Sequence, residues 1–150
     1  MPLPVRYRFC QRFAVSAKRA FEWCTTFDPQ DHKLMGDKGV ERHVTNLAEG
    51  TIILKDTFHT ATGTIEKEKL VQLYPDQLSW VSTHLTGPNK YSQFLYKISS
   101  EGEASILDFT GLHMDYQAKT GAESLAQKLC KEDAAAWKLL AKAMEEELGK

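Results

Sequence analysis

The sequence predicts an α+β domain in which a seven-stranded, curved antiparallel sheet packs against a long C-terminal helix. Two observations carry this prediction. Over residues 40–116, apolar and polar side chains alternate with a period of two, and turn residues interrupt the pattern at short intervals. Over residues 120–150, apolar side chains recur at helical spacing among strong helix formers. The chain has 150 residues, which suits one domain, 1–150, whose core needs neither disulfides nor metals.

The N-terminal part of the chain predicts one strand followed by two short helices. Residues 5–15 alternate between apolar and charged side chains and therefore predict a strand. Ser16 is then expected to cap a helix. The apolar residues of this helix follow the i, i+3, i+4, i+7 rule at Ala17, Ala20, Phe21, Cys24 and Phe27. Asp28 and Pro29 predict the start of a second helix, which closes at Gly36.

The rest of the chain divides into six strands and one helix. We place the strands near 40–47, 51–59, 63–74, 77–86, 91–100 and 104–116, with turns at "AEG", "ATG", "YPDQ", "GPNK" and "SEGE". The apolar stripe of the final helix is Ala122, Leu125, Leu129, Ala136, Leu140, Met144 and Leu148. At 1.5 Å per residue, about 28 residues form a rod of about 40 Å, which is long enough to cross a curved sheet.

Composition excludes several kinds of partner. Lys and Arg number 19 against 20 Asp and Glu, so the broad basic surface of a nucleic-acid-binding protein is not expected. No apolar run has the length of a membrane span, and no secretory leader is evident, so we expect a soluble, cytoplasmic protein without integral membrane association. Cys10, Cys24 and Cys130 are too widely spaced for a disulfide framework or a metal site and are interpreted as small buried hydrophobic residues. The oligomeric state is not predicted.

Three stretches of the chain resemble the START-related SRPBCC superfamily. They are "RFAVSAKRAFEWCTTFDPQ", "LYPDQLSWVSTHLTGP" and "SILDFTGLHMDY". The resemblance covers nearly the whole chain and implies the helix-grip fold, with the order strand, two short helices, six strands and a long C-terminal helix over a cavity. Members of the superfamily bind lipids, sterols, polyketides or plant hormones, and some cyclise polyketides or act as chaperone-associated domains. Fold alone does not choose among these activities.

A row of side chains in the strand 77–86 is the strongest candidate for a binding surface. Trp80, Ser82 and His84 lie two residues apart and therefore share one face. Matching large side chains across the turn "GPNK" places Trp80 opposite Tyr96 and Ser82 opposite Phe94. A shift by one residue, which would turn the row to the other face, remains an alternative.

The same matching extends the predicted face to the neighbouring strands. Across the turn "SEGE", it places Tyr96 opposite Leu107 and Phe94 opposite Phe109. The more apolar face of the strand 51–59 carries Ile52, Leu54, Asp56 and Phe58. A concave face that is apolar in the middle, with a few polar groups, is typical of a ligand pocket, although aromatic residues on such a face also form ordinary core.

We therefore predict a cavity between the sheet and the C-terminal helix that binds a hydrophobic or amphipathic small molecule. The predicted ligand-binding residues are Trp80, Ser82, His84, Phe94, Tyr96, Phe109, Leu54, Asp56, Phe58, Leu125 and Leu129. We expect no cofactor and assign no catalytic residue, because the chain has neither a Gly-x-Ser-x-Gly motif nor a glycine cluster that opens a helix.

The remaining charged residues predict no further site. His113 and Asp115 share a strand face, but the other histidines are scattered, so no metal site is predicted. Gly111 invites a β-bulge that could exchange the faces of its neighbours. The alternating charges of "KDTFHTATGTIEKEK", which include Lys67 and Lys69, are interpreted as a solvated sheet surface.

Three functions remain open. The first is a binding protein. The second is a cyclase or aromatase that uses His84 or Asp56 as a general base, and it should place at least two titratable groups within hydrogen-bond reach in the pocket. The third is a protein-interaction module resembling the chaperone-associated relatives, which should show a filled pocket and an exposed apolar patch.

Overall fold

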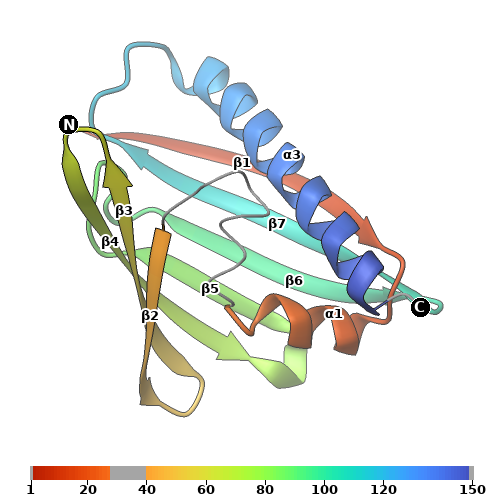
Figure 1. Cartoon of the computed structure of the whole chain (residues 1–150). Coiled ribbons are helices and arrows are strands. Elements are labelled where there is room, and N and C mark those ends of the chain that lie inside the picture. Colours follow the sequence, from red (N-terminus) through yellow and green to blue (C-terminus); the bar gives the residue numbers. More distant parts are fainter. Residues whose placement is uncertain (1, 28–39, 149–150) are drawn as a thin grey trace.

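The structure is a computed structural model that describes residues 2–27 and 40–148. Seven antiparallel strands form one sheet in the order β1-β7-β6-β5-β4-β3-β2, and a long helix crosses it (Figure 1). The elements are β1 Leu3–Phe13, α1 Ala17–Cys24, β2 Val40–Ala48, β3 Thr51–Thr60, β4 Gly63–Tyr74, a 3-10 turn η1 Pro75–Gln77, β5 Ser79–His84, β6 Gln93–Glu101, β7 Ala104–Asp115 and α3 Ala122–Leu148. The predicted fold class is confirmed, and the predicted second helix at 28–36 lies outside the described residues.

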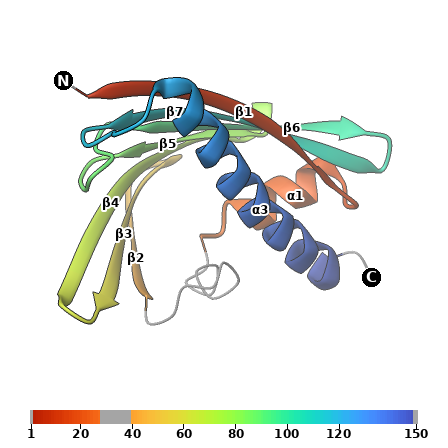
Figure 2. The same cartoon turned by 90° about the horizontal axis from the view of Figure 1, so that it is seen from above.

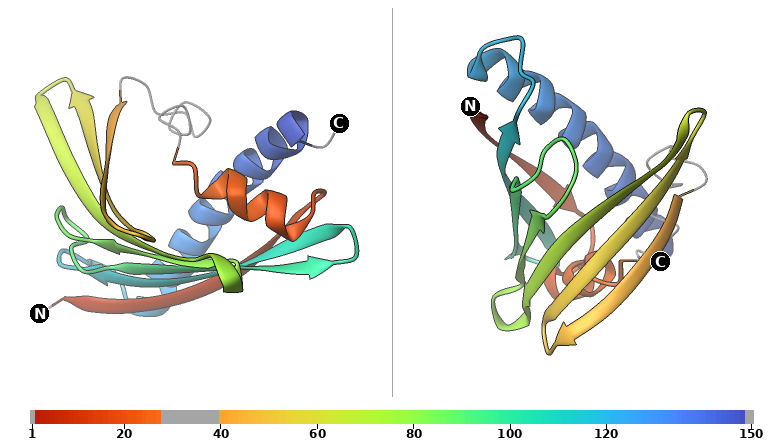
Figure 3. Two further views of the ribbon diagram at one scale, coloured as in Figure 1. Left: turned by 90° about the horizontal axis from the view of Figure 1, so that it is seen from below. Right: turned by 90° about the vertical axis from the view of Figure 1, so that its left-hand side faces the viewer.

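The sheet bends strongly, and both described helices lie on its concave side. Figure 2 shows β2, β3 and β4 curving away from the layer of β1, β5, β6 and β7, with α3 running diagonally across the concave side of the sheet. The two views in Figure 3 show α1 beside the C-terminal part of α3 on this same side. The helix α3 thus lies over the concave face on which the sequence predicts a cavity.

The predicted cap of the first helix is confirmed. The Ser16 hydroxyl accepts a hydrogen bond from the backbone N–H of Arg19 at 3.4 Å. The helix buries Ala17, Ala20 and Phe21 against the sheet, as the apolar spacing predicts.

The register between β5 and β6 is the predicted one, and that between β6 and β7 differs from prediction by two residues. Trp80 pairs with Tyr96 and Ser82 with Phe94. Tyr96 then pairs with Phe109, not with Leu107, because the chain reverses in a tight turn after Glu101, where Gly102 has a φ of 61°. A shift of two residues leaves every side chain on its predicted face.

Gly111 does not form the bulge that its sequence position invites. The pairing of β7 continues in register through Gly111 on both sides, with Tyr7 on β1 and Phe94 on β6. A Cβ atom added to Gly111 would lie 2.5 Å from Cζ of Tyr7. The glycine therefore makes room for the Tyr7 ring, and His113 keeps its face.

Among the described residues, the hydrophobic core forms two clusters. The larger joins α1, the sheet and the end of α3, where Leu140, Ala141 and Met144 are buried. In the smaller, Leu125 and Leu129 of α3 pack against Val5, Tyr7 and Phe109. The predicted stripe of α3 is thus buried most completely in its C-terminal half. Cys10 was expected in the core and is exposed, because its side chain lies on the outer face of β1.

Candidate functional site

A cavity of about 250 Å³ lies between the concave face of the sheet and the middle of α3. Five of the predicted site residues line it, namely Ser82, His84, Phe94, Tyr96 and Phe109. The remaining lining residues are Lys69, Asn89, Asp133, Ala136 and Trp137. The strands supply these side chains at alternate positions, so that one face of β4 to β7 forms the floor, and one turn of α3 forms the roof.

One wall of the cavity is aromatic. The rings of Tyr96 and Phe109 meet edge to face, with centroids 5.2 Å apart, and Phe94 lies 5.8 Å from Phe109. Trp137 of α3 lies 5.9 Å from Tyr96 and continues the wall onto the helix. Such rings offer a large apolar surface that favours flat, apolar ligand groups.

His84 contributes a buried polar ring to the lining of this cavity. Its side chain is buried, and its ring lies 5.1 Å from that of Phe94. Nδ1 of His84 and Oδ1 of Asn89 are buried and do not reach full hydrogen-bond geometry with any described residue, but the two side chains interact, and the Asn89 side chain opposes the lowering of the pKa of His84. Burial, with Lys69 next in effect, lowers the pKa of His84 to about 3, so its imidazole is neutral at pH 7.

Lys69 is the first functional candidate that the sequence reasoning missed. Lys67 and Lys69 lie on the concave face, contrary to the solvated surface expected for them, because Lys69 pairs with His84 of β5. Burial lowers the pKa of Lys69. The signal was available in the sequence, since Lys69 shares the parity of Val71 and Leu73 in an alternating strand.

Asp133 is the second missed candidate. It lies on α3, and its carboxylate accepts a hydrogen bond from the hydroxyl of Tyr7 on β1. Burial raises the pKa of Asp133, and the hydrogen bond from Tyr7 opposes this rise. The cavity therefore holds one titratable group that is hydrogen-bonded to another. No local pattern could reveal this pair, because it joins residues 126 positions apart.

Two predicted site residues lie in the larger core cluster, outside the lining of this cavity. Trp80 stacks on Tyr96 at 4.6 Å and meets the edge of Phe21 at 5.7 Å, so α1 covers it. Leu54 is buried in the same cluster. Trp80 lies outside the cavity because α1 packs on its end of the row, whereas α3 lies over the end that carries His84.

Four further predicted residues also lie outside this lining. Asp56 is 1% exposed and forms a bidentate ion pair with Arg42 at 2.7 and 2.9 Å. Phe58 carries the Lys67 ammonium 5.0 Å above its ring. The other two, Leu125 and Leu129, join α3 to β1 in the smaller core cluster.

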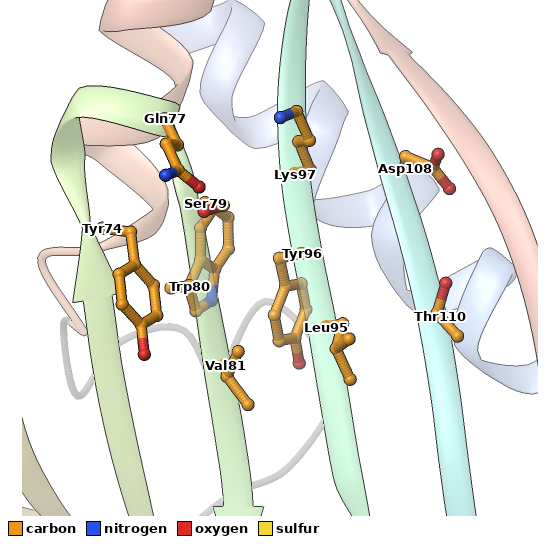
Figure 4. Close-up of a pocket in the computed structure, with 10 residues that line it drawn as sticks. All are labelled: Tyr74, Gln77, Ser79, Trp80, Val81, Leu95, Tyr96, Lys97, Asp108 and Thr110. Atoms are coloured by element: carbon orange, nitrogen blue, oxygen red, sulfur yellow. The ribbon is translucent and has the colours of Figure 1, made fainter.

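A larger hollow of about 430 Å³ lies on the opposite face of the sheet (Figure 4). It is lined by Tyr74, Gln77, Ser79, Trp80, Val81, Leu95, Tyr96, Lys97, Asp108 and Thr110. Tyr74 and Leu95 are 45% and 38% exposed, and Asp108 is engaged by Arg8. An open surface of this kind encloses a ligand less completely than the cavity under α3, which we take as the candidate site.

The described ranges 2–27 and 40–148 contain no group of three or more His, Cys, Asp or Glu residues that could hold a metal ion. His113 and Asp115 do meet, with Nε2 and Oδ2 3.5 Å apart, but as an isolated pair in this part of the chain. No described helix is long and apolar enough to cross a membrane.

Comparison by sequence finds no matching protein-family model and no matching curated protein. The structure is similar to that of the protein TTHA0849 from Thermus thermophilus, with a TM-score of 0.73, 14% identity, and 95% of this chain and 99% of that chain covered. It is also similar to the Zhui aromatase/cyclase from Streptomyces sp. R1128, with a TM-score of 0.68, 13% identity, and coverage of 96% and 93%.

Norcoclaurine synthase from Thalictrum flavum, in complex with dopamine and hydroxybenzaldehyde, gives a TM-score of 0.70 at 13% identity, with coverage of 99% of this chain and 91% of that chain. At such identities the likeness shows the fold alone. The chain has the helix-grip fold of the START-related SRPBCC proteins, as the sequence resemblance implies.

Proposed function

We propose that this protein binds a small amphipathic molecule, with an aromatic or apolar body and one polar group, in the cavity under α3. The observation that carries the proposal is the cavity itself, in which the rings of Phe94, Tyr96 and Phe109 lie beside the buried and neutral imidazole of His84. The structural neighbours include an aromatase/cyclase and a synthase in complex with two small aromatic molecules, which supports a ligand of this kind.

Energetics favour a ligand that carries a hydrogen-bonding group. A buried polar atom without a partner costs about 1 to 3 kcal/mol, and a ligand that supplies the partner recovers this free energy. Because the His84 imidazole is neutral at pH 7, it has one donor nitrogen and one acceptor nitrogen. A hydroxyl group on the ligand can pair with either nitrogen, and a carbonyl group can accept a hydrogen bond from the protonated one, while the apolar body of the ligand covers the rings of Phe94 and Phe109.

A matched pair of ligands tests this proposal. Benzyl alcohol and toluene differ by a hydroxyl group, and their affinities can be measured by calorimetry and by the melting temperature. We expect the wild-type protein to prefer benzyl alcohol, and His84→Leu to lose about 1 to 3 kcal/mol of this preference while toluene binds as before. His59→Leu is the control, because His59 is 48% exposed. Equal losses of affinity for both ligands in His84→Leu would contradict the proposal that His84 orients the polar group of the ligand.

A second candidate function is acid–base catalysis in the same cavity, of the kind that a cyclase requires. The observation that favours it is Asp133, a titratable group that lines the cavity and accepts a hydrogen bond from Tyr7, which lies outside the lining. Asp56, which the sequence offered as a general base, is held instead by Arg42. Turnover of a poly-β-ketone that is lost in Asp133→Asn and retained in Asp115→Asn would support this function. Equal turnover in wild type and Asp133→Asn would exclude Asp133 from it.

A further inference from the structure

Lys69 is an amine in an aromatic cavity, and the described part of the chain gives it no counter-ion. Its side chain lines the cavity together with Phe94, Tyr96 and Phe109. Within the described residues no carboxylate forms an ion pair with it and no group forms a hydrogen bond with it. A charged ammonium group is costly in such surroundings, whereas a neutral amine is tolerated.

The charged groups around Lys69 do not offset the cost of a positive charge on its amine. Asp56 is the main group that favours its charge, but the Arg42 guanidinium is paired with that carboxylate. Arg42 and Lys67 both disfavour a further positive charge at Lys69. Asp133, on the facing helix, also favours the charge but already accepts the Tyr7 hydrogen bond. His84, directly across from Lys69, is neutral and offers no counter-charge.

We propose that Lys69 condenses with an aldehyde or ketone bound in this cavity to form an imine, with Asp133 as the acid that removes water. The proposal rests on the proposed function, because the carbonyl compound must first bind as a ligand. Both residues line the same cavity, one on its floor and one on its roof. A desolvated lysine in an apolar pocket is the usual form of an imine-forming nucleophile.

The step balances without any further reagent. Nζ of neutral Lys69 attacks the carbonyl carbon, a C–N bond forms, and the proton lost from nitrogen passes to the oxygen to give a carbinolamine. The Asp133 carboxyl group then protonates the hydroxyl group, the C–O bond breaks, and water leaves. The resulting carboxylate takes the remaining N–H proton, which yields the imine and restores Asp133. Burial lowers the pKa of Lys69 and raises that of Asp133, so both shifts favour the reactive protonation states.

Reductive trapping tests the proposal on the full chain. The protein is incubated with benzaldehyde and sodium cyanoborohydride at about pH 6, where an ordinary lysine with a pKa of about 10.4 is almost wholly protonated. We expect peptide mapping to place a benzyl group on Lys69 and on no other lysine, apart from labelling of the α-amino group, whose ordinary pKa of about 7.7 to 8.0 also leaves it reactive. Lys69→Arg and Lys69→Met should each abolish this fast labelling, whereas Lys97→Met should retain it. Asp133→Asn should slow the labelling by about a hundredfold or more, which is the lower end of general acid catalysis.

The outcomes separate this proposal from the binding function. Labelling spread evenly over the lysines, or labelling that persists in Lys69→Arg, would overturn the role of Lys69, and an unchanged rate in Asp133→Asn would overturn that of Asp133. Benzyl alcohol is added in parallel, with the melting temperature as the readout. If benzyl alcohol stabilises the protein but benzaldehyde is not trapped, the cavity binds ligands and the proposal of imine formation is wrong. If neither occurs, the binding function fails as well.

Discussion

Tyr7 on β1 donates a hydrogen bond to Asp133 on α3, and this bond connects the edge strand of the sheet to the roof of the candidate site. The geometry depends on Gly111 of β7, which lies directly opposite Tyr7 and has no side chain to displace the ring. The position of the α3 carboxylate in the cavity is thus determined by residues on two strands at the far side of the sheet from β4.

Tyr7→Phe should destabilise the protein by about 1 to 3 kcal/mol at pH 7, because the partly buried Asp133 loses its donor. The pKa of Asp133 is already raised in the folded state. The contribution of Asp133 to the folding stability is therefore present at low pH and is lost as the pH rises through that pKa. The deficit should therefore be smaller at pH 4 than at pH 7. Urea denaturation at the two pH values measures it, with Tyr116→Phe as a control at a 43% exposed tyrosine.

Gly111→Ala should cost about 1 to 3 kcal/mol, because the new methyl group would overlap the Tyr7 ring. The cost should fall in a Tyr7→Leu background, where the ring is absent, and a double-mutant cycle measures the difference. If the losses of stability in the two single variants simply add, Gly111 is required by the backbone of β7 and not by the ring of Tyr7. Gly121→Ala is a suitable control, because nothing lies within 4 Å of a Cβ atom placed there.

The pKa of His84, lowered to about 3 in the folded protein, predicts a loss of stability in acid. Between this value and the unfolded value of about 6.5, the unfolded chain binds the additional proton, so stability falls as the pH falls through this window. His84→Leu removes this contribution and should move acid unfolding to lower pH, as followed by circular dichroism. An acid midpoint equal to that of the wild type would show that His84 is not responsible.

Met144→Asp should destabilise the protein by several kcal/mol or prevent folding, because Met144 is completely buried and the new carboxylate would lie in an apolar cluster. Leu139→Asp, on the same helix at a 51% exposed position, should change stability by less than about 0.5 kcal/mol. Thermal unfolding of both variants compares them. Similar losses would contradict the orientation of α3 on the sheet.

The sequence alone was sufficient to predict the strands, the helix cap at Ser16 and the face that each strand turns inward. These features follow from the alternation of side chains along a strand and from local hydrogen bonding, which act over a few residues. Even the two-residue error in the pairing of β6 with β7 left Tyr96 and Phe109 on the same face. Five lining residues of the cavity could be predicted on this basis.

The tertiary structure decided which parts of that face remain open and which charges meet there. Trp80 and His84 lie on the same row, yet α1 covers Trp80 whereas His84 borders the cavity. Asp133 lies in the cavity because of the crossing angle of α3 and the space above Gly111, and neither is encoded in a local pattern. Burial and charge pairing depend on every element that packs around a group, so the shifted pKa values of Lys69 and Asp133 exist only once the helix lies on the sheet.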